Sequence, residues 1–349
     1  MLHRNKIKRN LKRKARRQIK RLKQNHAKQL LSKEEKIAEL QSDVKVARNK
    51  LVLSQSNLRI KKCYKTSSFR KCIQIATGSC LTKSSKDSKR KIGELLSGIP
   101  LFGNTDVTKI DEKIFGEGQF GQMSLVRINK LNTVAACKKI NMKRCTRNDV
   151  LAEAIAGLTV AGSKYFPYVF GMLNESAILM EYFNESLSHG VVACSNLWEA
   201  VKMRSKPINP KATFTDAIQA VLYLHGEKIL HNDLKADNFV LTSDCLKLID
   251  FGKATMIISP KVYSIKPGSD LSKQYNTYHR HLAYELRNVP GSKQSVFTDI
   301  YSLGYMFKHV GPMLQCDEIV SSGRHMKVQE AEFRTPLTKA LQIVQSFDM

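Results

Sequence analysis

Hydrophobic residues follow two different periods along this 349-residue chain. Residues 4–53 contain neither Pro nor Gly, and their apolar residues recur every three or four positions, which predicts helix. The apolar residues around Ile19 and those around Leu40 do not lie in one continuous heptad register. A basic amphipathic helix that docks on an acidic partner or on anionic lipid therefore competes with a coiled coil. From Thr108 onward, apolar residues alternate and glycines interrupt them, which predicts strands and turns.

The second pattern predicts a strand-rich region that precedes a helix-rich region. Apolar runs on both sides of a turn at Lys130–Asn132 predict a hairpin followed by a further strand. Additional strands are predicted at Ser176–Tyr182, Val240–Leu241 and Leu246–Ile249. Helices are predicted at Asp149–Thr159, Thr213–His225 and Thr298–Val310. This order of elements predicts an α+β fold.

Charge divides the chain into a basic arm and a nearly neutral body. Residues 1–100 contain 29 Lys and Arg against 6 Asp and Glu, whereas residues 101–349 contain 29 against 24. A solvated, partly disordered extension would have this composition, and so would a surface for phosphate backbones or nuclear import. Tyr64 and Phe69 are the only Phe, Tyr or Trp residues of the arm. Through residues 1–95 we therefore expect non-specific nucleic acid binding, without base reading, or binding of an acidic partner.

Composition also predicts the domain boundaries and the cellular compartment. We expect a basic helical or disordered extension over residues 1–82, a Ser/Lys-rich linker over residues 83–104 and a folded body over residues 105–349. The eight cysteines never form a C-x-x-C pair, which favours reduced thiols. No apolar core follows the basic N-terminus, and charges interrupt every long apolar run. We expect an intracellular protein, cytoplasmic or nuclear, without a transmembrane segment.

Three glycines, Gly116, Gly118 and Gly121, form a G-x-G-x-x-G pattern. The pattern alone is weak evidence, because a dinucleotide-binding turn or an ordinary glycine turn would show it as well. A dinucleotide-binding fold requires a helix directly after the glycines, but Met123–Ile128 alternates like a strand. A glycine loop between two strands makes a flap whose backbone N–H groups can approach phosphates, because no Cβ intervenes.

Lys138 ends the apolar run Ala135–Lys138. Burial of its ammonium group is costly unless a carboxylate or a phosphate lies beside it. Glu153, on the next predicted helix, is the candidate counter-charge. Alternatively, Lys138 is an ordinary surface lysine on an edge strand. If the strand register differs by one residue, Lys139 takes the place of Lys138.

Polar groups are concentrated in HNDLKADN, residues 231–238, and in the D-F-G motif that begins at Asp250. Asp233 can orient a hydroxyl or accept its proton, and Lys235 can neutralise charge on a transferring phosphoryl group. Asn238 and Asp250 offer oxygen ligands of the kind that Mg²⁺ prefers. Phosphoryl transfer requires positioning and charge neutralisation more than covalent chemistry, and these groups supply both.

Glycine loop, strand lysine, H-x-D-L-K-x-x-N and D-F-G occur in the order and with the spacing of eukaryotic protein kinases, which residues 105–349 resemble. The resemblance implies a bilobal fold, with a small β-rich N-lobe over about residues 105–183 and a helical C-lobe over about residues 184–349. It implies transfer of the γ-phosphate of ATP to a protein hydroxyl with Mg²⁺. Because Lys235 follows Asp233 by two residues, the pattern resembles the serine/threonine type.

The resemblance also assigns roles to individual residues. Asp233 would be the catalytic base, with Lys235 and Asn238 beside it, and Asn238 and Asp250 would hold Mg²⁺. Residues assigned to ATP are Gly116, Gly118, Gly121, Ala136, Lys138, Glu153, Met180, Glu181 and Phe183. Met180 resembles the residue before the hinge, and Glu181 and Phe183 resemble the hinge itself. Asp299 is expected to steady the catalytic loop, Thr277 to bridge to Asp233, and Arg334 to pair with Glu285.

The chain departs from the family pattern in an expected short C-lobe, because only 50 residues follow Asp299, and at several positions, of which two bear on the site. Asn232 replaces the arginine that clamps a phosphorylated activation segment in the family. Gly157 lies where the family packs an apolar side chain between the lobes. The alternative function is a catalytically weak kinase-like binding or scaffolding module that works through its basic arm. Because Lys138, Asp233 and Asp250 are all present, we expect an active enzyme.

Overall fold

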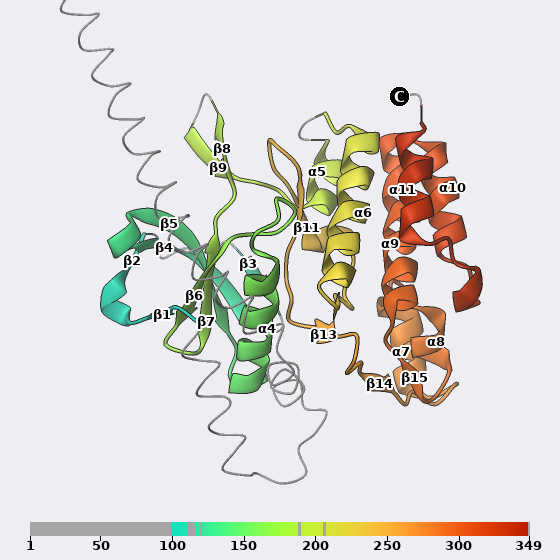
Figure 1. Cartoon of the computed structure of the whole chain (residues 1–349), viewed down its shortest axis with the longest axis horizontal. Helices are drawn as coiled ribbons and strands as arrows, with labels where there is room; N and C mark the ends of the chain where they lie inside the picture. The colour runs from blue at the N-terminus through green and yellow to red at the C-terminus, as the bar shows by residue number, and fades with distance from the viewer. Residues whose placement is uncertain (1–98, 111–115, 119–120, 188–189, 205–206, 348–349) are drawn as a thin grey trace, which may run out of the picture. The chain divides into compact units, whose positions relative to one another are not determined.

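The computed structural model describes residues 99–110, 116–118, 121–187, 190–204 and 207–347 (Figure 1). All of these belong to the second of two compact units of the chain, Gln55–Met349. The expected extension over residues 1–82, its predicted helix and its partners lie outside the described residues. Within the described residues, no helix is both long enough and apolar enough to cross a membrane.

Seven of the described strands form one sheet, which is the N-lobe. The strand order is β1-β6-β7-β5-β4-β2, and β3 pairs with β4. All pairs are antiparallel except β1 with β6. The strands are β1 (Leu101–Phe102), β2 (Val107–Lys109), β3 (Gly116–Gly118), β4 (Gly121–Ile128), β5 (Thr133–Ile140), β6 (Val169–Leu173) and β7 (Ala177–Glu181).

The hairpin predicted around Lys130–Asn132 is confirmed as β4 and β5. The chain turns through a short 3-10 helix, Asn129–Leu131, and Asn132 follows with a φ of 47°. Asparagine adopts this left-handed conformation more readily than most residues, so it suits the end of the turn. All eight residues of each strand then pair in register, which places Lys138 opposite Met123.

The sheet begins before the expected domain boundary. Leu101 pairs with Met172, and the Pro100 carbonyl accepts a 2.9 Å hydrogen bond from the Met172 N–H. Gly171 permits this approach, because its φ is 147° and a Cβ there would lie 2.1 Å from the Pro100 oxygen. Ile99 is buried in the core of the N-lobe. Residues 99–104 therefore belong to the folded domain, which corrects the expectation that the linker extends to residue 104.

Helix α4 (Arg147–Val160) lies against β6 and β7 (Figure 1). It begins with a capping box in which the Thr146 hydroxyl accepts the Asp149 N–H and Asp149 accepts the Thr146 N–H. Leu151 and Ile155 pack into the same apolar cluster as strand residues of the sheet. The helix is buried on nearly all sides, so it can carry a functional side chain into the interior.

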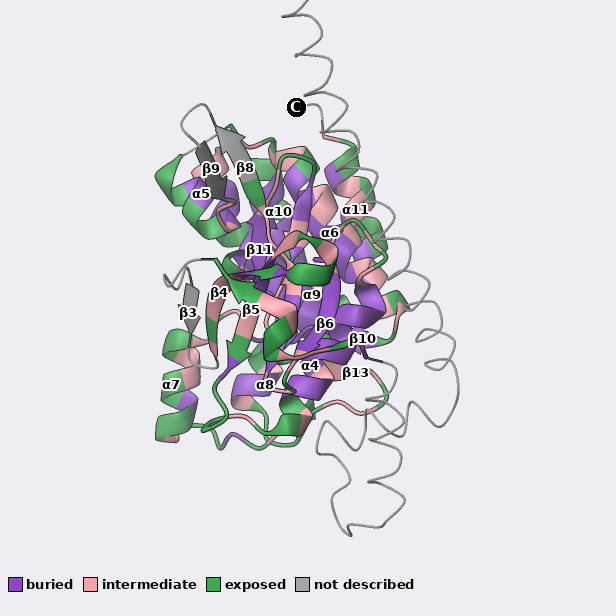
Figure 2. Cartoon of the chain, turned by 90° about the vertical axis from the view of Figure 1, so that its left-hand side faces the viewer, coloured by how far each residue is buried: buried purple, intermediate pink, exposed green. Residues whose placement is uncertain are grey.

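The C-lobe consists of helices around a second apolar cluster. Its helices are α5 (Leu197–Met203), α6 (Pro210–Gly226), α7 (Asp270–Tyr278), α8 (Tyr284–Asn288), α9 (Val296–Val310), α10 (Asp317–Met326) and α11 (Leu337–Gln345). Figure 2 shows buried positions along α6 and α9, where the rings of Phe214 and Phe307 meet edge to face at 4.4 Å. The α+β fold with a β-rich N-lobe and a helical C-lobe is confirmed.

Short strand pairs hold the loops of the C-lobe. They are β8 (Asn184–Leu187) with β9 (Gly190–Ala193), β10 (Ile229–Leu230) with β13 (Thr255–Met256), β11 (Phe239–Leu241) with β12 (Leu246–Leu248), and β14 (Val262–Tyr263) with β15 (Ser292–Lys293). The loop 231–238 runs between β10 and β11, and Asp250 follows β12. The strand pairs thus hold both ends of the polar loop close to the D-F-G motif.

Candidate active site

Lys138 of β5 reaches two carboxylates. Its Nζ lies 2.5 Å from Glu153 Oε1 on α4 and 2.7 Å from Asp250 Oδ1. The Lys138 and Glu153 side chains are 14% and 8% exposed, so water screens this ion pair little. Lys139 points to solvent, as strand alternation requires. The predicted pair of Lys138 and Glu153 is confirmed, and the alternative register is excluded.

The charges of this cluster depend on one another. Burial alone would lower the pKa of Lys138, but Glu153 and Asp250 raise it, so the side chain stays an ammonium. Burial raises the pKa of Glu153, against the pull of Lys138. Burial would also raise the pKa of Asp250, but Lys138 holds it below its usual value. A single ammonium, that of Lys138, thus lies between the carboxyl groups of Glu153 and Asp250.

Asp250 is held beside the polar loop by backbone contacts. The Ile249 N–H donates to the Asn238 carbonyl over 2.8 Å, which joins the residue before Asp250 to the loop. Asp250 has a φ of 65°, a conformation that costs about 1–3 kcal/mol outside glycine and is typical of functional sites. Its Oδ1 accepts the Gly252 N–H at 3.2 Å. A Cβ at Gly252 would lie 3.3 Å from that oxygen and crowd it.

Asp233 is surrounded by donors. Asn238 Nδ2 donates to its backbone carbonyl over 2.7 Å and to its Oδ2 over 3.3 Å, and Lys235 Nζ lies 3.4 Å from Oδ2. His281 Nε2 lies 3.0 Å from Oδ1. Burial would raise the pKa of Asp233, but the His281 hydrogen bond and the Lys235 ammonium hold it well below its usual value. The carboxylate is therefore ionised at neutral pH.

Asp299 of α9 holds the backbone at the start of the loop 231–238. It is fully buried and accepts the N–H groups of His231 and Asn232 at 2.9 Å each. His225 Nε2 lies 2.9 Å from the same carboxylate. Backbone donors of this kind fix the loop without using its side chains, so the expectation that Asp299 steadies the loop is confirmed.

Asn232 joins the loop to the segment that follows the D-F-G motif. Its Nδ2 donates to the Lys253 carbonyl over 3.0 Å and to Thr255 Oγ1 over 2.9 Å. Thr255 Oγ1 in turn donates to Gln294 Oε1 over 3.2 Å. Neutral hydrogen bonds thus hold the segment where the family uses an arginine and a phosphate.

Gly157 is explained by its neighbours. A Cβ on this residue would lie 2.8 Å from Val169 Cγ2 and 3.7 Å from the Phe251 ring. The Phe251 ring also packs at 5.9 Å from the ring of Phe166. Val169 and Phe251 therefore fill the space in which the family places an apolar side chain.

The donor set near Asp233 fits a magnesium ion. Both described bonds of the Asn238 side chain use Nδ2, which leaves its Oδ1 for a cation. The described side-chain contacts of Asp250 use Oδ1, which leaves its Oδ2. Among the described residues, no group of three or more His, Cys, Asp or Glu side chains is arranged so that it could hold a metal ion. Two oxygen donors are few, but Mg²⁺ is ordinarily held by one or two side chains together with water and substrate phosphates.

The glycines lie on two paired strands. Gly118, at the end of β3, pairs with Gly121, at the start of β4. A Cβ at Gly121 would lie 2.5 Å from the Lys139 carbonyl, so the packing of β4 on β5 by itself requires glycine there. Ala136 is buried and lies opposite Met180 of β7. Strand packing thus requires glycine at position 121, in addition to the phosphate contact that the resemblance assigns to it.

Lys247 of β12, which the sequence analysis did not select, contacts the end of β7 and the segment that follows it. Lys247 Nζ lies 3.6 Å from Glu181 Oε2 and 5.1 Å from the ring centroid of Phe183. Glu181 also exchanges hydrogen bonds with the Tyr168 backbone, and the Phe183 carbonyl accepts the Cys194 N–H at 3.0 Å. An adenine ring would therefore have to use the remaining backbone groups of Glu181 and Phe183.

Thr277 is not at the site, which corrects the expectation that it bridges to Asp233. It lies in α7 and is exposed, and its hydroxyl donates to the Lys273 carbonyl over 2.8 Å. The helix continues to Tyr278, so the hydroxyl satisfies a carbonyl of the preceding turn instead of reaching inward. His281, which sequence analysis missed, makes the contact to Asp233.

Arg334 and Glu285 form the predicted pair at the base of the C-lobe. The two guanidinium nitrogens lie 2.8 and 2.7 Å from the two carboxylate oxygens of Glu285. Arg334 is 1% exposed, and its remaining donors bind the carbonyls of Phe297, Val328 and Gln329. This bidentate contact anchors the end of the segment that contains His281.

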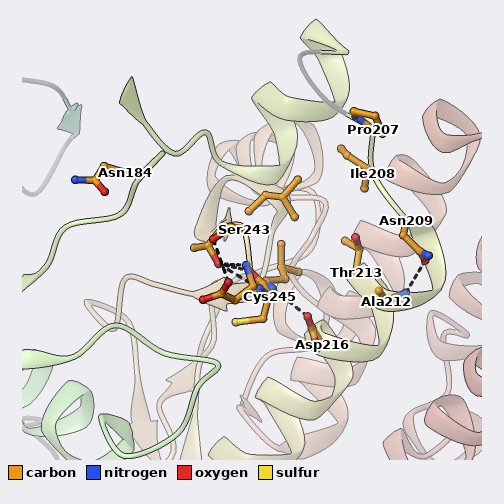
Figure 3. Close-up of a pocket in the computed structure, with 13 residues that line it drawn as sticks. Asn184, Pro207, Ile208, Asn209, Ala212, Thr213, Asp216, Ser243 and Cys245 are labelled. Atoms are coloured by element: carbon orange, nitrogen blue, oxygen red, sulfur yellow. Dashed lines mark hydrogen bonds between the residues drawn. The ribbon is translucent and has the colours of Figure 1, made fainter. Parts of the chain in front are cut away.

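A cavity of about 670 Å³ lies elsewhere in the C-lobe, between the start of α6 and the turn from β11 to β12 (Figure 3). Asp216 lines it, but the Asp216 carboxylate already accepts the Leu246 N–H at 3.0 Å. Lys138, Asp233 and Asp250 are not among its lining residues. The cavity is therefore separate from the candidate active site.

Comparisons with known proteins agree with the geometry. Residues 110–346 match the sequence model of the protein kinase domain. The dual specificity protein kinase Ttk of Danio rerio is 36% identical over 110 residues, which cover 31% of this chain and 11% of that protein. Cyclin-dependent kinase 7 of Carassius auratus is 31% identical over 166 residues, or 45% of this chain and 46% of that protein.

A further relative is the serine/threonine-protein kinase cst-1 of Caenorhabditis briggsae, which is 27% identical over 184 residues. These residues cover 49% of this chain and 35% of the relative. The chain thus spans less than half the length of each of these three relatives.

Proposed function

Because the chain belongs to the protein kinase family, we propose that it transfers the γ-phosphate of ATP to a serine or threonine hydroxyl of a protein. One observation carries the proposal: Glu153, Lys138 and Asp250 are in contact, and the Ile249 N–H before Asp250 binds the carbonyl of Asn238, which contacts Asp233. A serine/threonine-protein kinase among the relatives supports the choice of hydroxyl.

Each group of the series has a role in this reaction. Lys138 is a buried ammonium that binds nucleotide phosphates, and Glu153 holds it in place. Asp233 is ionised, so it orients the attacking hydroxyl and accepts its proton. Lys235, whose Nζ lies 3.4 Å from Oδ2 of that carboxylate, balances charge on the phosphoryl group. Asn238 and Asp250 would hold Mg²⁺, which neutralises the phosphate oxygens when it is bound.

The test compares two aspartates in the full chain. The protein is incubated with γ-labelled ATP, Mg²⁺ and a mixture of protein substrates, and the initial rate of label transfer is measured. Asp233→Asn is expected to lower kcat by about 10²- to 10⁴-fold, the usual contribution of a catalytic base. Asp244→Asn, the same change on an exposed turn, is expected to leave the rate unchanged. Absence of transfer by the wild-type protein, or equal transfer by the Asp233 variant, would reject the proposal.

A kinase-like binding module remains the alternative, because residues 1–100 have a net charge of +23. In that case the arm, residues 1–95, binds an acidic partner or nucleic acid electrostatically. Its removal should then flatten the dependence of nucleic acid retention on salt, and an unchanged slope would dismiss this function. An intracellular location, cytoplasmic or nuclear, is part of the proposal, because Cys137, Cys145 and Cys245 are reduced thiols.

A further inference from the structure

His281 occupies the space between the end of α7 and the start of α8, against the proposed catalytic base. Its Nε2 lies 3.0 Å from Asp233 Oδ1, and the two side chains are 11% and 16% exposed. A carboxylate can only accept hydrogen bonds, so the proton of this bond resides on His281 Nε2. The contact joins positions 48 residues apart in sequence, so tertiary structure alone creates it.

The contact distinguishes the two oxygens of the base. Oδ1 accepts from His281, whereas Oδ2 faces Asn238 Nδ2 at 3.3 Å and Lys235 Nζ at 3.4 Å. Donors on both sides oppose rotation of the carboxylate about its terminal bond. Since Lys235 would meet the phosphoryl group, Oδ2 is the oxygen on the side at which the reaction takes place.

The position of His281 is itself fixed from the C-terminal side. Leu282 is buried, and its carbonyl accepts Arg287 Nε at 2.9 Å. Ala283 is fully buried at the start of α8, and the helix is anchored through Glu285 to Arg334. The hydrogen bond between His281 and Asp233 therefore depends on how the segment that contains His281 packs on the C-lobe.

We propose that His281 is a positioning residue of the transfer reaction. Its Nε2–H holds Oδ1 of Asp233 so that Oδ2 faces the attacking hydroxyl. The inference rests on the proposed function, because it assigns the orientation of the same base. It also explains how a chain whose Thr277 hydroxyl points elsewhere orients Asp233.

The first test uses two variants at position 281 and a matched control at position 279. His281→Leu removes the donor, whereas His281→Gln keeps an N–H donor on a side chain of similar reach. His279→Leu removes the neighbouring imidazole, whose ring contacts are with Tyr275 at 4.8 Å and His281 at 6.1 Å. Steady-state transfer from γ-labelled ATP gives kcat and KM for each full-length variant, and melting curves check that each is folded.

His281→Leu should lower kcat by about 10- to 150-fold, the effect of losing a hydrogen bond to a charged group in the transition state. The KM for ATP should not change, because His281 does not touch the residues assigned to the nucleotide. His281→Gln should recover most of kcat, and His279→Leu should retain it. Equal losses in the Leu and Gln variants, or an equal loss in the His279 variant, would overturn the proposal.

The second test does not depend on activity. Nitrogen NMR of the full chain labelled at histidine should show the proton of His281 on Nε2, and Asp233→Ala should redistribute it between the two ring nitrogens. A proton absent from Nε2 in the wild-type protein would overturn the contact. If the wild-type protein transfers no phosphate, the proposed function fails, and the NMR result still decides whether His281 holds Asp233.

Discussion

Arg334 offers the sharpest test of how the C-lobe holds the segment beneath the active site. It is 1% exposed and donates to both oxygens of Glu285 and to three backbone carbonyls. Its guanidinium also lies 5.0 Å from the ring centroid of Tyr301. Replacement by Met keeps much of the apolar stem but removes every donor, so Glu285 and the carbonyls lose their partners.

The size of the loss follows from these contacts. Removing one member of a buried ion pair costs about 3–5 kcal/mol, because the other charge stays behind without a partner. The Glu285 side chain is 22% exposed, so water can reach part of it and we use this range without adding the carbonyls. For a domain of about 250 residues, the loss corresponds to a fall in Tm of about 6–20 °C.

Urea unfolding of the full chain, followed by fluorescence, measures the effect. Lys273→Met serves as the control, because it removes the pair with Asp270 in which both side chains are largely exposed. We expect no measurable shift of its midpoint, since such pairs contribute little. Adding Glu285→Gln to Arg334→Met should recover part of the loss, because the second change removes the stranded charge. An Arg334→Met midpoint equal to that of the control would refute this reasoning.

Three further predictions concern the active site. Lys138→Met should weaken ATP binding about 10- to 150-fold by calorimetry, whereas Lys139→Met should not, because only Lys138 faces the carboxylates. The pKa of Asp233 is lowered in the folded state, so its carboxylate stabilises the fold above the unfolded value of about 3.9. That contribution disappears as pH falls through the folded pKa, so urea midpoints of wild type and Asp233→Asn should differ most near pH 7 and converge in acid. A gap that widens in acid would contradict the assignment. Thr277→Val should leave the transfer rate unchanged, and a large loss of rate would mean that Thr277 contributes to the reaction after all.

Residues that carry local chemistry could be predicted from the sequence. Lys138 and Glu153 were identifiable because an isolated charge in an apolar strand requires a partner on the next helix. The pair of Arg334 and Glu285 was identifiable only through the family resemblance, since the two positions are 49 residues apart.

Contacts that tertiary packing creates left no signal in the sequence. β1 has two residues, too few to show a period, and it is recognisable only from its pairing with β6. Thr277 was misplaced because α7 extends through it, so its hydroxyl donates to the Lys273 carbonyl of the preceding turn. Lys247 alternates with Leu246 and Leu248, as an outward residue of any strand would, and His281 stands beside Arg280, so the folded chain alone reveals the partners of His281 and Lys247.

The most direct test of the central claim is a single turnover of label from ATP. The wild-type protein, Asp250→Asn and Asp244→Asn are each mixed in excess with Mg²⁺ and ATP labelled at either the γ- or the α-phosphate, and the labelled amino acids are identified. The account predicts γ-label, and no α-label, on serine or threonine for wild type and Asp244→Asn, with loss of transfer in Asp250→Asn and on chelation of Mg²⁺. Transfer that survives both the Asp250 change and chelation would contradict it.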